Sequence, residues 1–212
     1  MKRYYPKGFE YFKTFEKELK TRSGYKQLFG SRKEFYVLGN LGNYTLEKYK
    51  VAFKDLTDLF QCAVVKPPTA GGVRKTVVPD HTVLFITCSG EDEAYFIAGV
   101  LNSVPARVAL YCQSVGVQTQ RYFTVDIARV QQLSFNRSQK LHADISRLSR
   151  AAHEAAQSGT GLEKAEEDLA ACVGELWNIN KTQLKQIHDL YRLLQGFRQS
   201  QSEEEEVLED EE

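Results

Sequence analysis

The chain has 212 residues, 42% hydrophobic and 26% charged, which is enough for one or two domains with a sizeable core. No apolar run approaches the ~20 residues that span a bilayer, and the N-terminus lacks a signal-peptide core, so we expect a cytoplasmic protein with no membrane partner. The net charge is zero, but eight of the 28 acidic residues lie in the segment 203–212, so 28 − 20 leaves +8 for the remainder. A basic body suits a polyanionic partner, although a solvated surface with a solubilising tail has the same composition.

The first predicted element is a helix near the N-terminus that ends near residues 23–24. Its apolar residues recur at three- and four-residue steps and form one stripe, which we expect to pack in a core: Tyr5, Phe9, Phe12, Phe15 and Leu19. Short β-like runs follow, separated by turns rich in glycine, asparagine and proline, at 34–38, 49–53, 61–65 and 83–87. A small mixed α/β body is therefore predicted.

A helix is predicted after Ser89, whose side chain is expected to accept a hydrogen bond from an early helix N–H. The acidic residues that follow Ser89 favour the positive end of the helix dipole, and the helix should end around Asn102-Ser103. The next segment, 105–113, fits either a buried strand or a second short helix, and we favour the helix.

Helical periodicity dominates from about residue 138. Apolar stripes predict one helix over about 141–152, a second that begins at a capping box made by Thr160 and Glu163, and a third from near Asn180. These stripes must pack on each other, on the α/β body or on another chain. The predicted fold class is α+β: an α/β recognition domain at 1–137, a helical packing or interaction segment at 138–196, and a disordered acidic tail at 197–212.

Catalytic constellations are hard to assemble from this sequence. The four histidines have no neighbouring nucleophile or motif, and we expect each to be structural. The cysteines are widely spaced, with no C-x-x-C pair, so no metal site is predicted. Gly159-Thr160-Gly161 lies between helices rather than after a strand, and the segment 71–76 lacks phosphate-loop spacing, so a helix linker and a basic loop are the expected roles.

The positive signals are basic and aromatic side chains that occur together. Lys and Arg neutralise phosphates, while Arg and Gln can make paired hydrogen bonds to guanine and adenine edges. The predicted phosphate-contacting and flanking residues are Lys33, Tyr36, Lys48, Lys50, Arg74 and Lys75. The residues predicted to read or wedge bases are Gln118, Gln120, Arg121 and Tyr122.

A succession of short motifs over residues 4–195 carries a resemblance to a known family. The motifs are Tyr4-Tyr5-Pro6, Tyr49-Lys50-Val51-Ala52-Phe53, Val78-Pro79-Asp80, Glu93-Ala94-Tyr95-Phe96-Ile97 with Leu101-Asn102-Ser103, and Val125-Asp126-Ile127 before Leu133-Ser134-Phe135. Their order resembles the C-terminal target-recognition region, the TaqI-like specificity domain, of type II restriction-modification N6-adenine DNA methyltransferases. Val173-Gly174-Glu175-Leu176-Trp177 is similar to the closing helices of those enzymes.

The resemblance implies a module that recognises a target sequence in double-stranded DNA. The family's Asn-Pro-Pro-aromatic catalytic motif and its glycine-rich turn for S-adenosylmethionine are both missing, since no proline follows an asparagine. The chain is therefore not expected to be an enzyme by itself: a methyltransferase domain or subunit would bind that cofactor and flip the target base. A non-catalytic helical interaction module with an incidental basic surface is the alternative, and an enzyme with an unfamiliar, scattered site is a second one.

Overall fold

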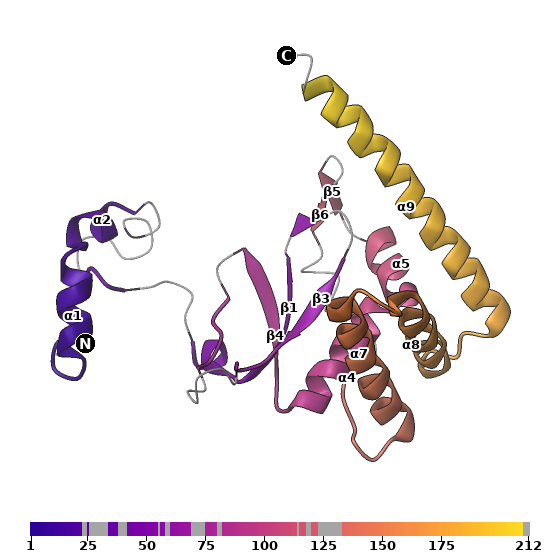
Figure 1. Ribbon diagram of the computed structural model, residues 1–212, viewed down its shortest axis with the longest axis horizontal. Coiled ribbons are helices and arrows are strands. Elements are labelled where there is room, and N and C mark those ends of the chain that lie inside the picture. Colours follow the sequence, from indigo (N-terminus) through magenta and orange to yellow (C-terminus); the bar gives the residue numbers. More distant parts are fainter. Residues whose placement is uncertain are drawn as a thin grey trace. The chain divides into compact units, whose positions relative to one another are not determined.

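The computed structural model describes residues 1–22, 25, 34–37, 42–54, 56–57, 60–68, 75–79, 82–113, 115–117, 120–122 and 133–209. Side chains are described for these residues apart from 56, 113, 115–117, 120–122 and 197–209. The chain divides into two compact units, unit 1 at Met1–Thr45 and unit 2 at Leu46–Glu212 (Figure 1). Helices combine with small antiparallel sheets, which confirms the predicted α+β class.

Unit 1 contains two short helices, α1 (Pro6–Lys13) and α2 (Glu16–Thr21), where the sequence predicts one. The break lies at Thr14, whose backbone N–H and Oγ1 both donate to the Tyr11 carbonyl, at 3.2 and 2.7 Å. This local side-chain bond competes with the regular helical ladder. The single-helix prediction is therefore wrong at its middle.

The aromatic stripe of unit 1 is largely open to solvent, which corrects the expectation that it packs in a core. Neither helix has a buried residue, and Tyr5 is 71% exposed. Phe9 is the better-packed member: its ring lies 5.8 Å from Phe35 and 6.0 Å from Tyr36. Residues 34–37, predicted as a strand, form a turn in which the backbone N–H of Val37 donates to the carbonyl of Glu34.

Two three-stranded antiparallel sheets occur in unit 2. The first has the order β3-β1-β4, from β1 (Tyr49–Lys54), β3 (Cys62–Val65) and β4 (Val83–Cys88), and it confirms the three predicted runs. The second has the order β2-β6-β5, from β2 (Leu56–Thr57), β5 (Val115–Val117) and β6 (Gln120–Tyr122).

Helices complete unit 2: α4 (Glu91–Asn102), α5 (Val104–Gln113), α7 (Lys140–Ser158), α8 (Leu162–Leu176) and α9 (Lys181–Glu209). Helix α4 lies beside α7 in Figure 1, and its residues 94–101 are buried. One core cluster joins the sheet, α4, α7 and α8 through residues such as Val51, Phe96, Ile145 and Leu169. The C-terminal helices α7 and α8 therefore pack on the α/β body, which is one of the arrangements that the sequence leaves open.

Helix α5 resolves the ambiguous segment in favour of the helix. Helix α9 packs on it: Tyr191 shares a second buried cluster with Val104 and Val108. The backbone of α9 stays helical to Glu209, through most of the segment predicted as a disordered tail from residue 197. Figure 1 shows the C-terminal half of this helix extending beyond α5.

Both predicted helix caps are wrong. Helix α4 begins after Gly90 with no side-chain cap, and Ser89 donates instead, through N and Oγ, to Glu93 Oε2 at 2.6 Å. The hydrogen bond that Ser89 donates to the Glu93 carboxylate is charge-assisted. It is therefore stronger than the bond that the Ser89 hydroxyl could accept from a neutral backbone N–H. Helix α8 begins after Gly161, whose left-handed φ of 74° suits glycine, and the Thr160 side chain takes no part in capping.

His142 is buried within this core. Its ring stacks on Phe96 at 4.5 Å, and its Nδ1 accepts the Asn136 backbone N–H at 3.0 Å. Desolvation by burial lowers the pKa of His142 below its ordinary 6.5. The folded protein therefore favours the neutral form of this imidazole.

We expect acid to weaken the fold through His142. Below pH 6.5 the unfolded chain binds a proton that the folded chain rejects, so the stabilisation is present above that pH and is lost as the pH falls. The slope should stay below about 1.4 kcal/mol per pH unit, the limit for one group that takes up a full proton on unfolding. Urea unfolding of the protein and of His142→Gln between about pH 7 and 5 measures it, and parallel curves for the two proteins would contradict the assignment.

Candidate nucleic-acid interface

Three exposed lysines lie on or near the first sheet. Lys48 is exposed just before the strand, Lys54 is exposed at its end, and Lys75 is exposed in the segment 75–79. Within the described part of unit 2, none of these three forms an ion pair. Their charges are therefore open to an anionic partner.

Lys50, unlike these three lysines, is not accessible to a partner. The prediction that it contacts phosphate is therefore wrong. Its side chain is fully buried, and its ammonium donates to the carbonyl oxygens of Glu47 and Val77, the latter at 3.1 Å. Desolvation lowers the pKa of Lys50, with Glu47 opposing the shift. The hydrogen bond to Val77 joins the segment 75–79 to the start of β1.

This buried lysine joins two chain segments that each carry an exposed lysine. Lys48 lies two residues before Lys50, and Lys75 lies two residues before Val77, each at most about 7 Å of extended chain from the joined pair. Two positive charges are thus held at one end of the first sheet. The sequence places them in separate clusters 27 residues apart, and the Lys50 contact joins the two segments that carry them.

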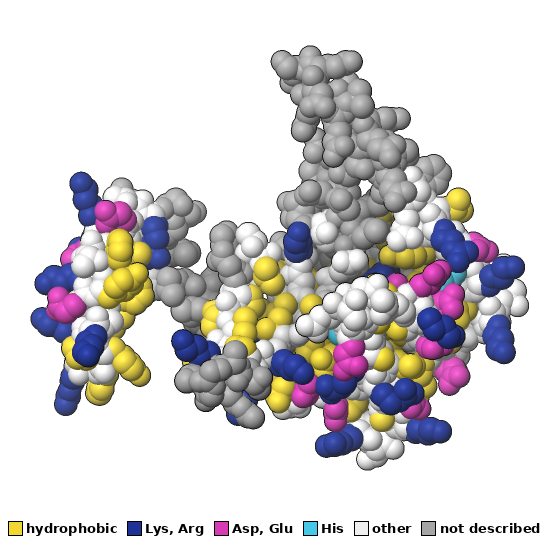
Figure 2. Space-filling model, viewed as in Figure 1, with side chains coloured by type: hydrophobic (Ala, Val, Ile, Leu, Met, Phe, Trp, Pro, Cys, Tyr) yellow, Lys and Arg dark blue, Asp and Glu magenta, His cyan; other side chains and the backbone are white. Residues whose placement is uncertain are grey.

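Several other cations of unit 2 are engaged by carboxylates. Glu91 accepts from Lys66 Nζ at 2.9 Å and from Arg150 Nη1 at 2.7 Å, and hydrogen bonds from Lys66 and Arg150 lower the pKa of Glu91. Arg150 also lies 4.1 Å from the ring of Tyr95. Figure 2 shows basic and acidic side chains interleaved over this helical part, which is typical of a solvated face.

The remaining predicted residues divide into three groups. Tyr36 is half-buried in unit 1, with its ring 5.2 Å from that of Phe35. Gln120, Arg121 and Tyr122 form β6, the central strand of the second sheet, paired with β2 and β5, although their side chains lie outside the described part. Lys33, Arg74 and Gln118 also lie outside the described residues.

Exposed aromatic rings in unit 1 are candidates that sequence reasoning missed. The yellow hydrophobic side chains are visible on unit 1 in Figure 2, and the most exposed are Tyr4 at 73%, Tyr5 at 71% and Tyr11 at 62%. The Arg3 guanidinium lies 5.6 Å from the Tyr4 ring. Aromatic faces beside cations suit stacking on bases. A sequence feature could have indicated that these rings are exposed. Lysines are interleaved with the aromatic residues, so little of either helix surface is apolar.

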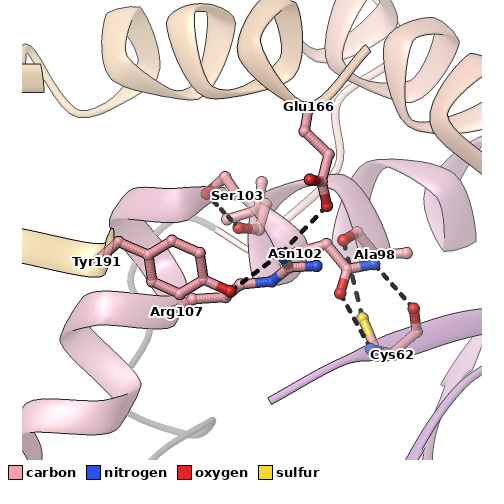
Figure 3. A network of polar contacts seen from close by, with 8 residues as sticks. Cys62, Ala98, Asn102, Ser103, Arg107, Glu166 and Tyr191 are labelled. Atoms are coloured by element: carbon pink, nitrogen blue, oxygen red, sulfur yellow. Dashed lines mark hydrogen bonds and ion pairs between the residues drawn. The ribbon is translucent and has the colours of Figure 1, made fainter. Parts of the chain in front are cut away.

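Asn102 and Ser103 explain the junction between α4 and α5 (Figure 3). Asn102 Oδ1 accepts the Cys62 N–H at 3.0 Å and Nδ2 donates to the Cys62 carbonyl at 2.8 Å, so the amide pairs with β3 as a neighbouring strand would. Ser103 Oγ donates to the Val100 carbonyl at 2.7 Å and accepts from Ala106 N–H at 3.4 Å, which caps α5. Asn102 and Ser103 therefore have a structural role: they fix the junction of α4 and α5 against β3.

The described residues contain no group of three or more histidine, cysteine or acidic side chains suited to a metal ion. Burial raises the pKa of the Cys62 and Cys88 thiols to about 12 and that of Cys172 to about 11, so these thiols stay protonated and are weak nucleophiles. No single helix among the described residues could cross a membrane by length and apolar character; α4 and α5 reach that threshold only jointly, with a bend of 61° between them.

No protein-family model matches the sequence, and no curated protein is significantly similar to it.

Proposed function

We propose that the chain recognises a target sequence in double-stranded DNA for an adenine-N6 methyltransferase or restriction-modification enzyme. A separate catalytic domain or subunit would bind S-adenosylmethionine and transfer the methyl group. The observation that supports this proposal most directly is the Lys48–Lys75 pair, held at one end of the sheet by the buried Lys50 contact to Val77. The +8 balance outside the acidic segment 203–212 adds to it.

The division of labour follows from the chemistry of the groups. Lys48 and Lys75 would neutralise phosphates and set the register on the duplex, which carries no sequence information by itself. Base edges would be read by the predicted residues of β6 and the preceding Gln118, since Gln and Arg can make paired hydrogen bonds to adenine and guanine. The first sheet would support the phosphate contacts, and the second sheet would support the residues that read bases.

Salt dependence is the test of this interface. The full chain is titrated with randomised duplex DNA at several salt concentrations, and bound sequences are selected. Lys48→Gln with Lys75→Gln should reduce the slope of log K against log salt by about 1.8, since each phosphate contact contributes about 0.9. Enrichment of one short motif would show that recognition is sequence-specific.

Two further variants separate direct contact from net charge and from positioning. Lys181→Gln with Lys185→Gln removes the same charge from the exposed face of α9 and should leave the slope unchanged. Lys50→Met removes the ammonium that donates to Val77 and keeps both exposed lysines, so its folded fraction should bind DNA more weakly than the parent if that contact positions Lys48 and Lys75. Equal slopes for the parent and the Lys48/Lys75 variant would exclude this interface.

A helical interaction module is the second candidate, favoured by an open apolar groove. A groove of about 430 Å³ lies between the end of α8 and α9, lined by residues that include Trp177, Ile179, Ile187 and Leu190. Leu193, one turn further along α9, is 60% exposed. If the chain acts only through this face, the DNA titration will show no salt-dependent binding, and Leu190→Gln with Leu193→Gln will disrupt partner binding.

A further inference from the structure

An exposed aromatic surface lies on unit 1. The large hydrophobic residues that are exposed within residues 1–22 are all aromatic, and they are 40% to 73% accessible: Tyr4, Tyr5, Tyr11, Phe12 and Phe15. Apolar side chains grouped on a surface often mark an interaction site, because their contact with water is unfavourable. This aromatic surface is therefore a candidate binding site.

Tyr11, Phe12 and Phe15 form a three-ring cluster at the end of α1. The centroid of the Tyr11 ring lies 5.6 Å from that of Phe12 and 5.4 Å from that of Phe15, at interplanar angles of 75° and 64°. In such edge-to-face pairs at least one ring is not covered by its neighbour, and all three rings are accessible. The three-ring cluster therefore presents flat aromatic surface to solvent.

Three exposed lysines accompany the three-ring cluster: Lys7, Lys13 and Lys17. Lys7 precedes Tyr11 by four residues within α1, so the two side chains lie on the same side of the helix. The other two lie within two residues of a ring of the cluster in the sequence. None of the three lysines forms an ion pair within the described residues, whereas Lys20 pairs with Glu16. Residues 1–22 carry seven lysine and arginine residues and three glutamates, so 7 − 3 leaves +4.

The composition of this surface favours nucleobases over lipid. Helices that lie in a membrane interface carry an extended apolar face, whereas α1 and α2 have eight and six residues, and no leucine or methionine is exposed within residues 1–22. Nucleobases have flat faces that stack on aromatic rings, and lysines neutralise phosphates. In a duplex those faces are covered by neighbouring base pairs, so the rings can stack only on unpaired bases.

We propose that unit 1 binds a single strand of nucleic acid. Unpaired bases would stack on the three-ring cluster, and the phosphates of the strand would lie beside the three lysines. Stacking tolerates any base, because every base has a π-face, so this site adds affinity without reading sequence. It uses none of the residues of the duplex interface proposed for unit 2, and it does not depend on that proposal.

Fluorescence anisotropy of a labelled oligodeoxythymidylate, titrated with the full chain, tests this site. The matched probe is an abasic strand of the same length, which keeps the phosphates and lacks the bases. We expect the abasic strand to bind about tenfold more weakly, since its contacts with the rings are lost. Equal affinities would show that only phosphates are contacted, and would overturn the proposal. Binding to phosphatidylserine vesicles without binding to the oligonucleotide would overturn it in favour of a membrane surface.

Substitutions within the three-ring cluster separate stacking from general hydrophobic contact. Tyr11→Leu with Phe15→Leu keeps apolar, helix-forming side chains but removes two rings, so oligodeoxythymidylate should bind about tenfold more weakly. Tyr11→Phe with Phe15→Tyr keeps both rings and should bind as the parent does. Lys48→Gln with Lys75→Gln should also bind this strand as the parent does, which distinguishes the site from the duplex interface. Parent-like binding by the leucine variant, or loss of binding by the Lys48/Lys75 variant, would contradict the proposal.

Discussion

Replacing Asn102 with alanine will lower the free energy of unfolding by about 3 kcal/mol, because it leaves two buried backbone groups of Cys62 without partners. Cys62 is 8% exposed, so water cannot fully replace the lost amide. The contact spans 40 residues of sequence and ties the end of α4 to β3. Urea unfolding measures the loss, and hydrogen exchange at the Cys62 amide should accelerate with it.

Gln61→Ala is the matched control for this change. Gln61 carries a side-chain amide immediately before Cys62, but its side chain is exposed. Its removal should change stability by less than about 0.5 kcal/mol, as for most surface positions. If Asn102→Ala unfolds at the same urea concentration as Gln61→Ala, the strand-like pairing of Asn102 does not stabilise the fold.

Replacing Gly99 with alanine will lower the free energy of unfolding by about 2 kcal/mol, because helices α4 and α7 touch at this residue. An added Cβ would lie 2.9 Å from Ser149 Cβ, 3.0 Å from Ile145 Cγ2 and 3.3 Å from the Ile145 carbonyl oxygen. The backbone of α7 would have to move to relieve this overlap. The overpacking outweighs the gain in helix propensity of up to about 1 kcal/mol that alanine brings.

Gly174→Ala provides the control on a neighbouring helix. Its Cβ would meet the Ile179 oxygen and Leu184 Cδ2 at 3.7 Å, an ordinary contact. The helix-propensity term then acts alone, and the variant should be as stable as the parent or more stable by up to about 1 kcal/mol. If alanine raised the free energy of unfolding equally at Gly99 and Gly174, the close crossing of α4 and α7 would be contradicted.

Local patterns predicted most elements of unit 2. The alternation in 49–53, 61–65 and 83–87 marks β1, β3 and β4, and the apolar stripes mark α7, α8 and α9. Such patterns can be read from neighbouring residues, because each helix or strand buries one face and its apolar residues then recur with the period of that element. The two helix caps failed because Glu93 competes for Ser89 and because glycine supplies the left-handed entry to α8.

The candidate interface was less predictable, because accessibility depends on packing. Lys48 and Lys50 look alike in sequence, yet Lys48 is exposed and Lys50 is buried between two carbonyl groups. The aromatic stripe of unit 1 has helical spacing, yet no residue of α1 or α2 is buried. Periodicity shows that a face is apolar, and it does not show what covers that face.

The sequence by itself determined the α+β class, the basic balance and the positions of the main strands and helices, since each depends on composition or on neighbours within a few residues. The tertiary structure alone decided which charges stay free. Arg107 meets Glu166 and Tyr191 across 59 and 84 residues, and Lys50 meets Val77 across 27. Such contacts form only when distant elements share one core, because burial and not sequence distance selects the partners of a polar group.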